Sequence, residues 1–318
     1  MKSISVTSKL REMLLEQDDA GQRLVLCRLT TGAAVVRTVW HLPPGDFMAD
    51  YADMLNGSGT GSGTRRALQP HLYEGLRVLA ATSAAAWALG NDHPAVKITA
   101  NASFALLQRY VVAFHEDLWS YNSHLNVFLG ALSLTRSSGD SVSSPGASQA
   151  HSALLAALQA YYAAMYLQSG ISKFVGAGWK WTGGSALHGA WGELGTHLGK
   201  RLASHGGSLP RALSTATLAY ELAFVPVLLL AWRRRALLGL SSAAFHGAVK
   251  ATLDISFWHL SWFSAPLFVV PASLAEPVVE AIQAPRRSKL ASGALVAAGV
   301  AVAAAPLVRA LWGKRNRR

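Results

Sequence analysis

The sequence has few of the residues on which disulfide and metal chemistry depend. Cys27 is the only cysteine among 318 residues. A single cysteine excludes an intramolecular disulfide, a multi-cysteine zinc site and an iron–sulfur cluster ligated within one chain. The histidines show no metal-ligand spacing, so no metal site is predicted. Cys27 is expected to be a small, buried, apolar side chain.

Charge is also scarce. Only 14% of the residues are charged, 51% are hydrophobic, ten are tryptophan, and the mean hydropathy is +0.24. This composition is too apolar for an ordinary soluble domain of this size. The sequence therefore predicts an all-α protein, a polytopic transmembrane helical bundle with about eight or nine membrane segments.

The expected membrane segments are stretches that approach the roughly 20 mainly apolar residues that cross a bilayer. They are residues 22–41, 74–90, 98–114, 124–135, 154–174, 212–232, 236–253, 255–270 and 292–312. The fourth is short enough to be a half-span. Glycine, serine and proline mark loops at 43–70, 137–149 and 176–210. The predicted division is an amphipathic N-terminal segment (1–21), a membrane domain (22–275), and a C-terminal loop, last helix and basic tail (276–318).

Basic residues outnumber acidic ones, with 29 Lys and Arg against 17 Asp and Glu. They lie at predicted helix ends and in short loops, without the interleaved aromatics of a nucleic-acid surface, so no nucleic-acid partner is expected. If the N-terminus is cytoplasmic, alternating spans place most basic clusters on that side, including the run 233–235. The tail at 314–318 falls on the other side, and that conflict stays open. The lipid bilayer is the predicted partner.

Lys173 closes a stretch, Tyr162–Lys173 (YAAMYLQSGISK), that contains no other charged residue. A lysine at the end of an apolar helix either snorkels to the membrane surface or is kept for its chemistry. The predicted topology places Lys173 and His124 near the outer face, at neighbouring ends of different helices. For His124 the alternative is a capping or interhelical hydrogen bond. Glu221 is expected to pair with a basic residue of another helix and to be architectural.

Three segments carry a resemblance to a known family. They are WSYNSHL (119–125), YLQSGISKF (166–174) followed by WKWTGGSAL (179–187), and ELAFVP (221–226) followed by an arginine run and AFH (244–246). Their order and spacing resemble those of the vitamin K-dependent gamma-carboxylase family and its bacterial relatives, the HTTM group. The similar region covers roughly residues 119–271.

The resemblance implies a role for each matching residue. Lys173 falls where the carboxylase has its proposed base for reduced vitamin K, which requires a neutral amine, and desolvation in an apolar pocket favours that form. The deprotonated hydroquinone reacts with oxygen to give a strong base, which removes a glutamate γ proton, and the carbanion adds carbon dioxide. A reduced quinone, O2 and CO2 are thus the implied cofactors. His124 would stabilise an anionic intermediate. The expected substrate-binding residues are Asn122, Trp181, Gly184 and His246.

Two departures modify this expectation. An N-S-H sequence replaces the family's N-N-H, and Gly178 stands where an aspartate usually precedes the tryptophan. The large domain that docks protein glutamates is expected to be absent. We therefore expect a bacterial inner-membrane enzyme that couples oxidation of a quinol or phenol-type compound to modification of a small molecule or peptide. The alternative is a non-catalytic membrane protein for maturation, export or immunity towards a peptide or toxin. For His246 the alternative is a hydrogen bond within the bundle.

Overall fold

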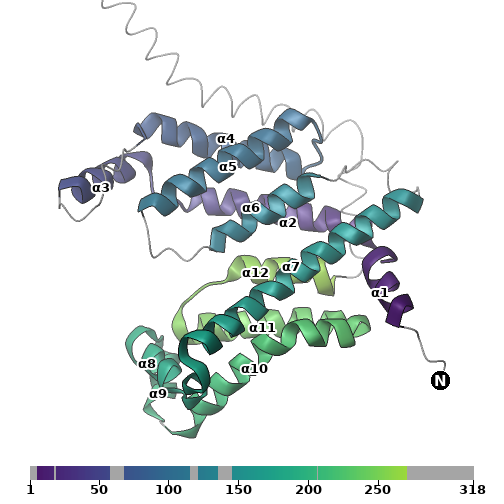
Figure 1. Ribbon diagram of the computed structural model, residues 1–318. Helices are drawn as coiled ribbons and strands as arrows, with labels where there is room; N and C mark the ends of the chain where they lie inside the picture. The colour runs from purple at the N-terminus through teal and green to yellow at the C-terminus, as the bar shows by residue number, and fades with distance from the viewer. Residues whose placement is uncertain are drawn as a thin grey trace, which may run out of the picture. The chain divides into compact units, whose positions relative to one another are not determined.

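The computed structural model describes residues 6–17, 19–57, 68–114, 121–134, 145–205 and 207–270. Every regular element within these ranges is helical (Figure 1), so the predicted all-α class is confirmed for them. The chain divides into two compact units. One comprises residues 1–24 and 145–275, and the other comprises residues 25–144 and 276–318. Helix α2 (Ala20–Trp40) begins in the first unit and continues into the second.

The first unit is built around the 33-residue helix α7 (Pro145–Ala177). This helix packs along α10 (Ser208–Leu230) and against α1 (Val6–Leu15). Between α7 and α10 lie η2 (Gly178–Gly183), α8 (Ser185–Leu194) and α9 (His197–Ser204). The short η3 (Trp232–Arg234) leads into α11 (Arg235–Leu253), which packs against α12 (Trp258–Ser264) and the π-helical turn η4 (Ala265–Val269).

The second unit contains the rest of α2 with α3 (Gly45–Gly57), α4 (Pro70–Ala88), α5 (Pro94–Phe114) and α6 (Tyr121–Ser133). Helices α4 and α5 each begin with proline, whose fixed φ and missing N–H suit the first position of a helix. Arg28 is buried here at 3% exposure. Its guanidinium donates to the carbonyl of Trp87 at 2.5 Å and to Asp92 at 2.8 Å. These bonds explain how α2 accommodates an arginine in its apolar face.

The sequence placed loops where the structure has helices. Helix α3 lies within the predicted loop 43–70, and η2, α8 and α9 lie within the predicted loop 176–210. The described end of the third predicted loop, residues 145–149, belongs to α7. These predictions were wrong because glycine was read as a loop signal, whereas Thr196 caps α9 by accepting from the N–H of Gly199 at 3.2 Å. The predicted span 292–312 lies outside the described residues.

The structure supports fewer membrane spans than the eight or nine that the sequence predicts. Among the described helices, α10 alone is both long and apolar enough to cross a membrane. Helix α7 has the length, but polar side chains recur along one of its faces, and α2 carries three arginines. Of the most apolar window of α10, 28% is buried.

Candidate functional site

One face of α7 carries a row of polar side chains through an otherwise apolar, alanine-rich helix. Members of this polar stripe lie three, four or seven positions apart, and that spacing places them on one side of an α-helix. The polar stripe consists of Ser152, Gln159, Tyr162, Tyr166, Ser169 and Lys173. Its partners are Gln17, which follows α1, and residues of α10, α11, α12 and η4, so each polar group is matched within the first unit.

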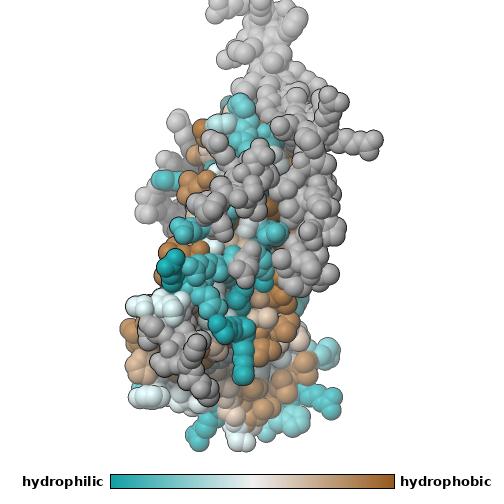
Figure 2. All heavy atoms as spheres, turned by 90° about the vertical axis from the view of Figure 1, so that its right-hand side faces the viewer, coloured by the Kyte–Doolittle hydropathy of each residue, from teal (hydrophilic) through white to brown (hydrophobic). Residues whose placement is uncertain are grey.

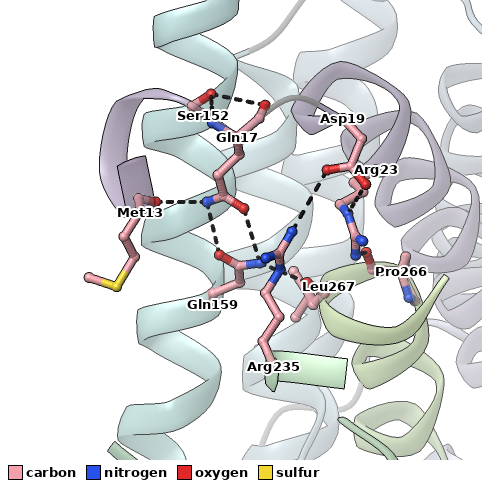
Figure 3. A network of polar contacts seen from close by, with 9 residues as sticks. All are labelled: Met13, Gln17, Asp19, Arg23, Ser152, Gln159, Arg235, Pro266 and Leu267. Atoms are coloured by element: carbon pink, nitrogen blue, oxygen red, sulfur yellow. Dashed lines mark hydrogen bonds and ion pairs between the residues drawn. The ribbon is translucent and has the colours of Figure 1, made fainter. Parts of the chain in front are cut away.

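The first part of the polar stripe is a network of amides (Figure 3). The side chain of Gln17 donates to Gln159 Oε1 at 3.1 Å, and Gln159 Nε2 donates to the carbonyl of Leu267 at 2.7 Å. The backbone N–H of Gln17 donates to Ser152 Oγ at 3.1 Å. Gln17 and Gln159 are 4% and 1% exposed. The Leu267 carbonyl lies in the π-helical turn, and the buried Gln159 amide supplies its hydrogen-bond donor.

The middle of the polar stripe is a chain of hydroxyl groups that ends at a histidine. The hydroxyls of Tyr162 and Tyr166 each lie 2.5 Å from Ser242 Oγ, and the hydroxyl of Tyr166 lies 2.7 Å from His246 Nε2. Tyr162 also donates to the carbonyl of Leu260 at 2.9 Å. His246 is 6% exposed, and its Nδ1 has no hydrogen-bond partner among the described residues. These hydrogen bonds join α7, α11 and α12 and restrict how the three helices can pack against one another.

Lys173, at the end of the polar stripe, forms an ion pair with Glu221 of α10. Its ammonium nitrogen donates to the two carboxylate oxygens at 2.7 and 2.8 Å and to Ser169 Oγ at 2.6 Å. Ser169 in turn donates to Glu221 Oε1 at 3.0 Å. Three acceptors match the three N–H donors of an ammonium, whereas a neutral amine has two donors and a lone pair. The geometry is that of a charged lysine.

The two members of the ion pair differ in their access to water. The side chain of Glu221 is 5% exposed and that of Lys173 is 22% exposed. The ring of Trp181, in η2, lies with its centroid 5.6 Å from the lysine nitrogen, within the range of a cation–π contact. The indole N–H of Trp181 is buried and has no partner in the described part of the chain. Glu221, Lys173 and Trp181 thus provide a buried carboxylate, a more accessible cation and an indole N–H that no described residue accepts.

Small residues allow this close approach. A Cβ on Gly170 would lie 2.9 Å from Leu222 Cδ2 and 3.1 Å from Glu221 Cβ, so glycine lets α7 and α10 meet where the ion pair forms. Gly184 has φ +82°, and a Cβ there would lie 2.4 Å from the backbone nitrogen of Arg211. Only glycine suits both that conformation and that space. Gly184 therefore fixes η2 and Trp181 against the start of α10.

The predicted site residues fall into separate groups. Lys173 and Trp181 lie together, Gly184 supports Trp181, and His246 belongs to the hydroxyl chain. His124, which is partly exposed near the start of α6, belongs to the second unit, and the side chain of Asn122 lies outside the described residues. The convergence of Lys173 with His124 therefore stays a prediction. Among the described residues, no three His, Cys, Asp or Glu side chains are grouped closely enough to hold a metal ion.

Sequence reasoning found part of this centre. The expected pairing of Glu221 with a basic residue of another helix is confirmed by Lys173, but neither that partner nor Ser169 was identified. The signal was present, because Tyr162, Tyr166, Ser169 and Lys173 follow the spacing of one helical face, which identifies them as a set. The partner on α10 had no such signal, since pairing between helices depends on their packing.

Comparison with known proteins found no family model, curated protein or solved structure that matches this chain. The resemblance of its three segments to the carboxylase family stays a prediction.

Proposed function

We propose that the protein is an integral membrane enzyme that deprotonates a weakly acidic, lipid-soluble substrate of the quinol or phenol type. The observation that carries this proposal is the centre formed by Lys173, Ser169 and Glu221. An ionised pair at a helix–helix contact within an apolar protein is costly and marks a functional site by default. The serine hydroxyl shared by both charges gives the pair a fixed geometry.

Placement in a membrane is supported by large apolar side chains that lie exposed on the described helices. On α10 and α11, Leu230 is 77% exposed, Leu237 is 62% exposed and Leu240 is 54% exposed. Figure 2 shows one face of the molecule, on which hydrophobic side chains lie at the surface beside hydrophilic ones. Lipid contact explains this exposure, together with the length and composition of α10. We propose the bacterial inner membrane as the location, following the family resemblance.

The proton transfer is assigned to the two charged residues in complementary roles. A substrate hydroxyl gives its proton to the Glu221 carboxylate, and the O–H electron pair stays on the substrate oxygen. Lys173 keeps its three protons and stabilises the new oxyanion in place of the neutralised carboxylate. This assignment moves the base from Lys173, where the resemblance places it, to Glu221, because the lysine is already charged in the pair. Trp181 adds a second donor toward the anion.

The later steps rest on the family resemblance alone. A deprotonated quinol is electron-rich, and O2 and CO2 are the co-substrates that the resemblance implies for carboxylation or a related oxidation. The chain's own contribution is to bind the substrate beside the ion pair, to hold its proton on Glu221 and to keep the oxyanion paired.

Oxygen consumption provides the test. The protein would be reconstituted in nanodiscs and supplied with 2-methyl-1,4-naphthohydroquinone, and oxygen uptake would be followed above the uncatalysed rate. Positioned acid–base groups contribute roughly 100-fold or more to rate, so Lys173→Ala and Glu221→Gln should each lose about that factor. Arg234→Ala, which removes an exposed cation at the other end of α10, is the control and should be unaffected. Full activity in Glu221→Gln would refute the assigned base.

A second function is favoured by the same ion pair. If Lys173 and Glu221 only join α7 to α10, the chain is a non-catalytic membrane protein for peptide maturation, export or immunity. The double exchange Lys173→Glu with Glu221→Lys keeps an ion pair but reverses its direction. An architectural role predicts that this variant regains the stability lost in either single exchange and has wild-type function in cells. The enzyme proposal predicts a stable but inactive protein.

A further inference from the structure

The three short helices between α7 and α10 form a folded cap, which we define as residues 178–205 (η2, α8 and α9). The cap is fixed to the end of α11. The backbone N–H of Thr196 donates to the carbonyl of Thr252 at 3.0 Å, and its hydroxyl donates to the carbonyl of Ala251 at 2.6 Å. A Cβ on Gly199 would lie 2.1 Å from the Thr252 carbonyl oxygen, and Trp191 beside it is 2% exposed. The cap is therefore a defined surface.

The charge on this surface is mostly of one sign. Across the cap and the first residues of α10, from 178 to 211, the only acidic residue is Glu193, while four residues are Lys or Arg. All four cations are exposed, and none forms an ion pair with a described residue. They are Lys180, Lys200, Arg201 and Arg211. Unpaired cations on a folded segment fit an anionic partner.

Apolar side chains lie exposed among these cations. Trp179 is 75% exposed, Leu194 is 66% exposed and Leu198 is 47% exposed. At the adjoining end of α7, Val175 is 78% exposed, and the ring of Phe174 contacts that of Trp179 at a centroid distance of 5.3 Å. An exposed indole beside aliphatic side chains and cations is the composition of a surface at the membrane–water interface.

The length of α10 matches a position of the cap at the membrane–water interface. Helix α10 follows the cap after a short turn and has 23 residues. At 1.5 Å per residue it is about 35 Å long, close to the roughly 30 Å hydrocarbon core of a bilayer. A cap at the end of such a helix lies among the lipid headgroups. This step rests on the membrane placement in the proposed function.

We infer that the cap binds the phosphates of anionic phospholipid headgroups. Lys200 and Arg201 pair with lipid phosphates, and Trp179 lies at the boundary between headgroups and acyl chains.

A thermal-shift experiment tests this inference on the full chain in a neutral detergent. Short-chain phosphatidylglycerol should raise the Tm, and the matched phosphatidylcholine should not. Each cation near an anionic surface changes binding by about fivefold, so Lys200→Gln with Arg201→Gln should weaken half-saturation by roughly 25-fold. The control, Arg109→Gln with Arg234→Gln, removes two exposed arginines outside the cap and should retain the response. Equal stabilisation by both lipids, or equal loss in both double variants, would overturn the inference.

Two further measurements separate this inference from the proposed function. Brominated phosphatidylglycerol should quench the part of the fluorescence that Trp179→Phe removes, and an unquenched signal would contradict the position of the cap. Alkaline extraction of membranes reports insertion independently. If the protein is released but still floats with phosphatidylglycerol vesicles through Lys200 and Arg201, the membrane-spanning proposal fails and headgroup binding stands.

Discussion

The ion pair between Lys173 and Glu221 predicts an asymmetric cost when its members are neutralised one at a time. Lys173→Met removes the cation and leaves a carboxylate that is 5% exposed and still accepts a hydrogen bond from Ser169 Oγ at 3.0 Å. A buried charge without its partner costs about 3 kcal/mol. Glu221→Gln leaves a lysine that is 22% exposed and able to move its ammonium toward water. That change should cost about 1 kcal/mol.

The double variant separates pairing from packing. If the two single costs added, Lys173→Met with Glu221→Gln would lose about 4 kcal/mol. We expect a loss of about 1 kcal/mol, because no charge remains buried, and hence a coupling energy of about 3 kcal/mol. Such a coupling identifies the buried carboxylate as the source of the cost in the Lys173 variant.

Thermal unfolding in detergent, followed by tryptophan fluorescence, provides the measurement. For a chain of a few hundred residues, 1 kcal/mol corresponds to about 2–4 °C, so Lys173→Met should lower the Tm by roughly 6–12 °C and the other two variants by roughly 2–4 °C. Circular dichroism would check that the helices form in each variant. Equal losses in the two single variants, or additive losses in the double variant, would refute the reasoning from burial.

Three other substitutions test the surroundings of the site by the same Tm measurement. Gly184→Ala should lose more than about 2 kcal/mol, because it combines a positive φ with a backbone clash, whereas Gly183→Ala, which meets nothing within 4 Å, should lose less than about 1 kcal/mol; equal effects would contradict this account. Gln159→Leu should cost about 1–3 kcal/mol, because it removes the donor to the Leu267 carbonyl and one partner of the buried Gln17 amide, and a neutral result would show that these groups find other partners. Tyr166→Phe should cost about 1–2 kcal/mol, since it removes one hydroxyl with two partners, and an unchanged Tm would exclude a stabilising hydroxyl chain.

The helices of the bundle could be predicted well because their signals are local. Apolar stretches at helical spacing gave the central parts of α2, α4, α5, α7, α10 and α11, and α12 with η4 lies within the expected stretch 255–270. Asp254, which separates the expected stretches 236–253 and 255–270, has φ 58° and follows the last residue of α11. The cap was missed because its short helices have few apolar positions and its glycines were taken as loop residues. Their role is close contact with neighbouring backbone.

Membrane crossing was the more difficult inference. Composition measures how apolar a segment is, but it does not tell whether protein or lipid covers that segment. Helix α7 illustrates the difference, since its polar stripe lowers its hydropathy although most of the stripe packs against other helices of the first unit. The length of a helix and its hydropathy are properties of sequence, whereas the partner of each face is a property of packing.

The sequence by itself determined an all-helical, apolar and basic chain, and it singled out Lys173 as the charge that ends an apolar run. The tertiary structure decided what that charge contacts. Gly170 lets α7 approach α10, Glu221 is thereby brought within 2.8 Å of the ammonium, and Gly184 turns the chain so that Trp181 lies beside it. Local patterns set which face of a helix is polar. Which two polar faces meet depends on contacts between residues 48 positions apart, and only the packed fold fixes those.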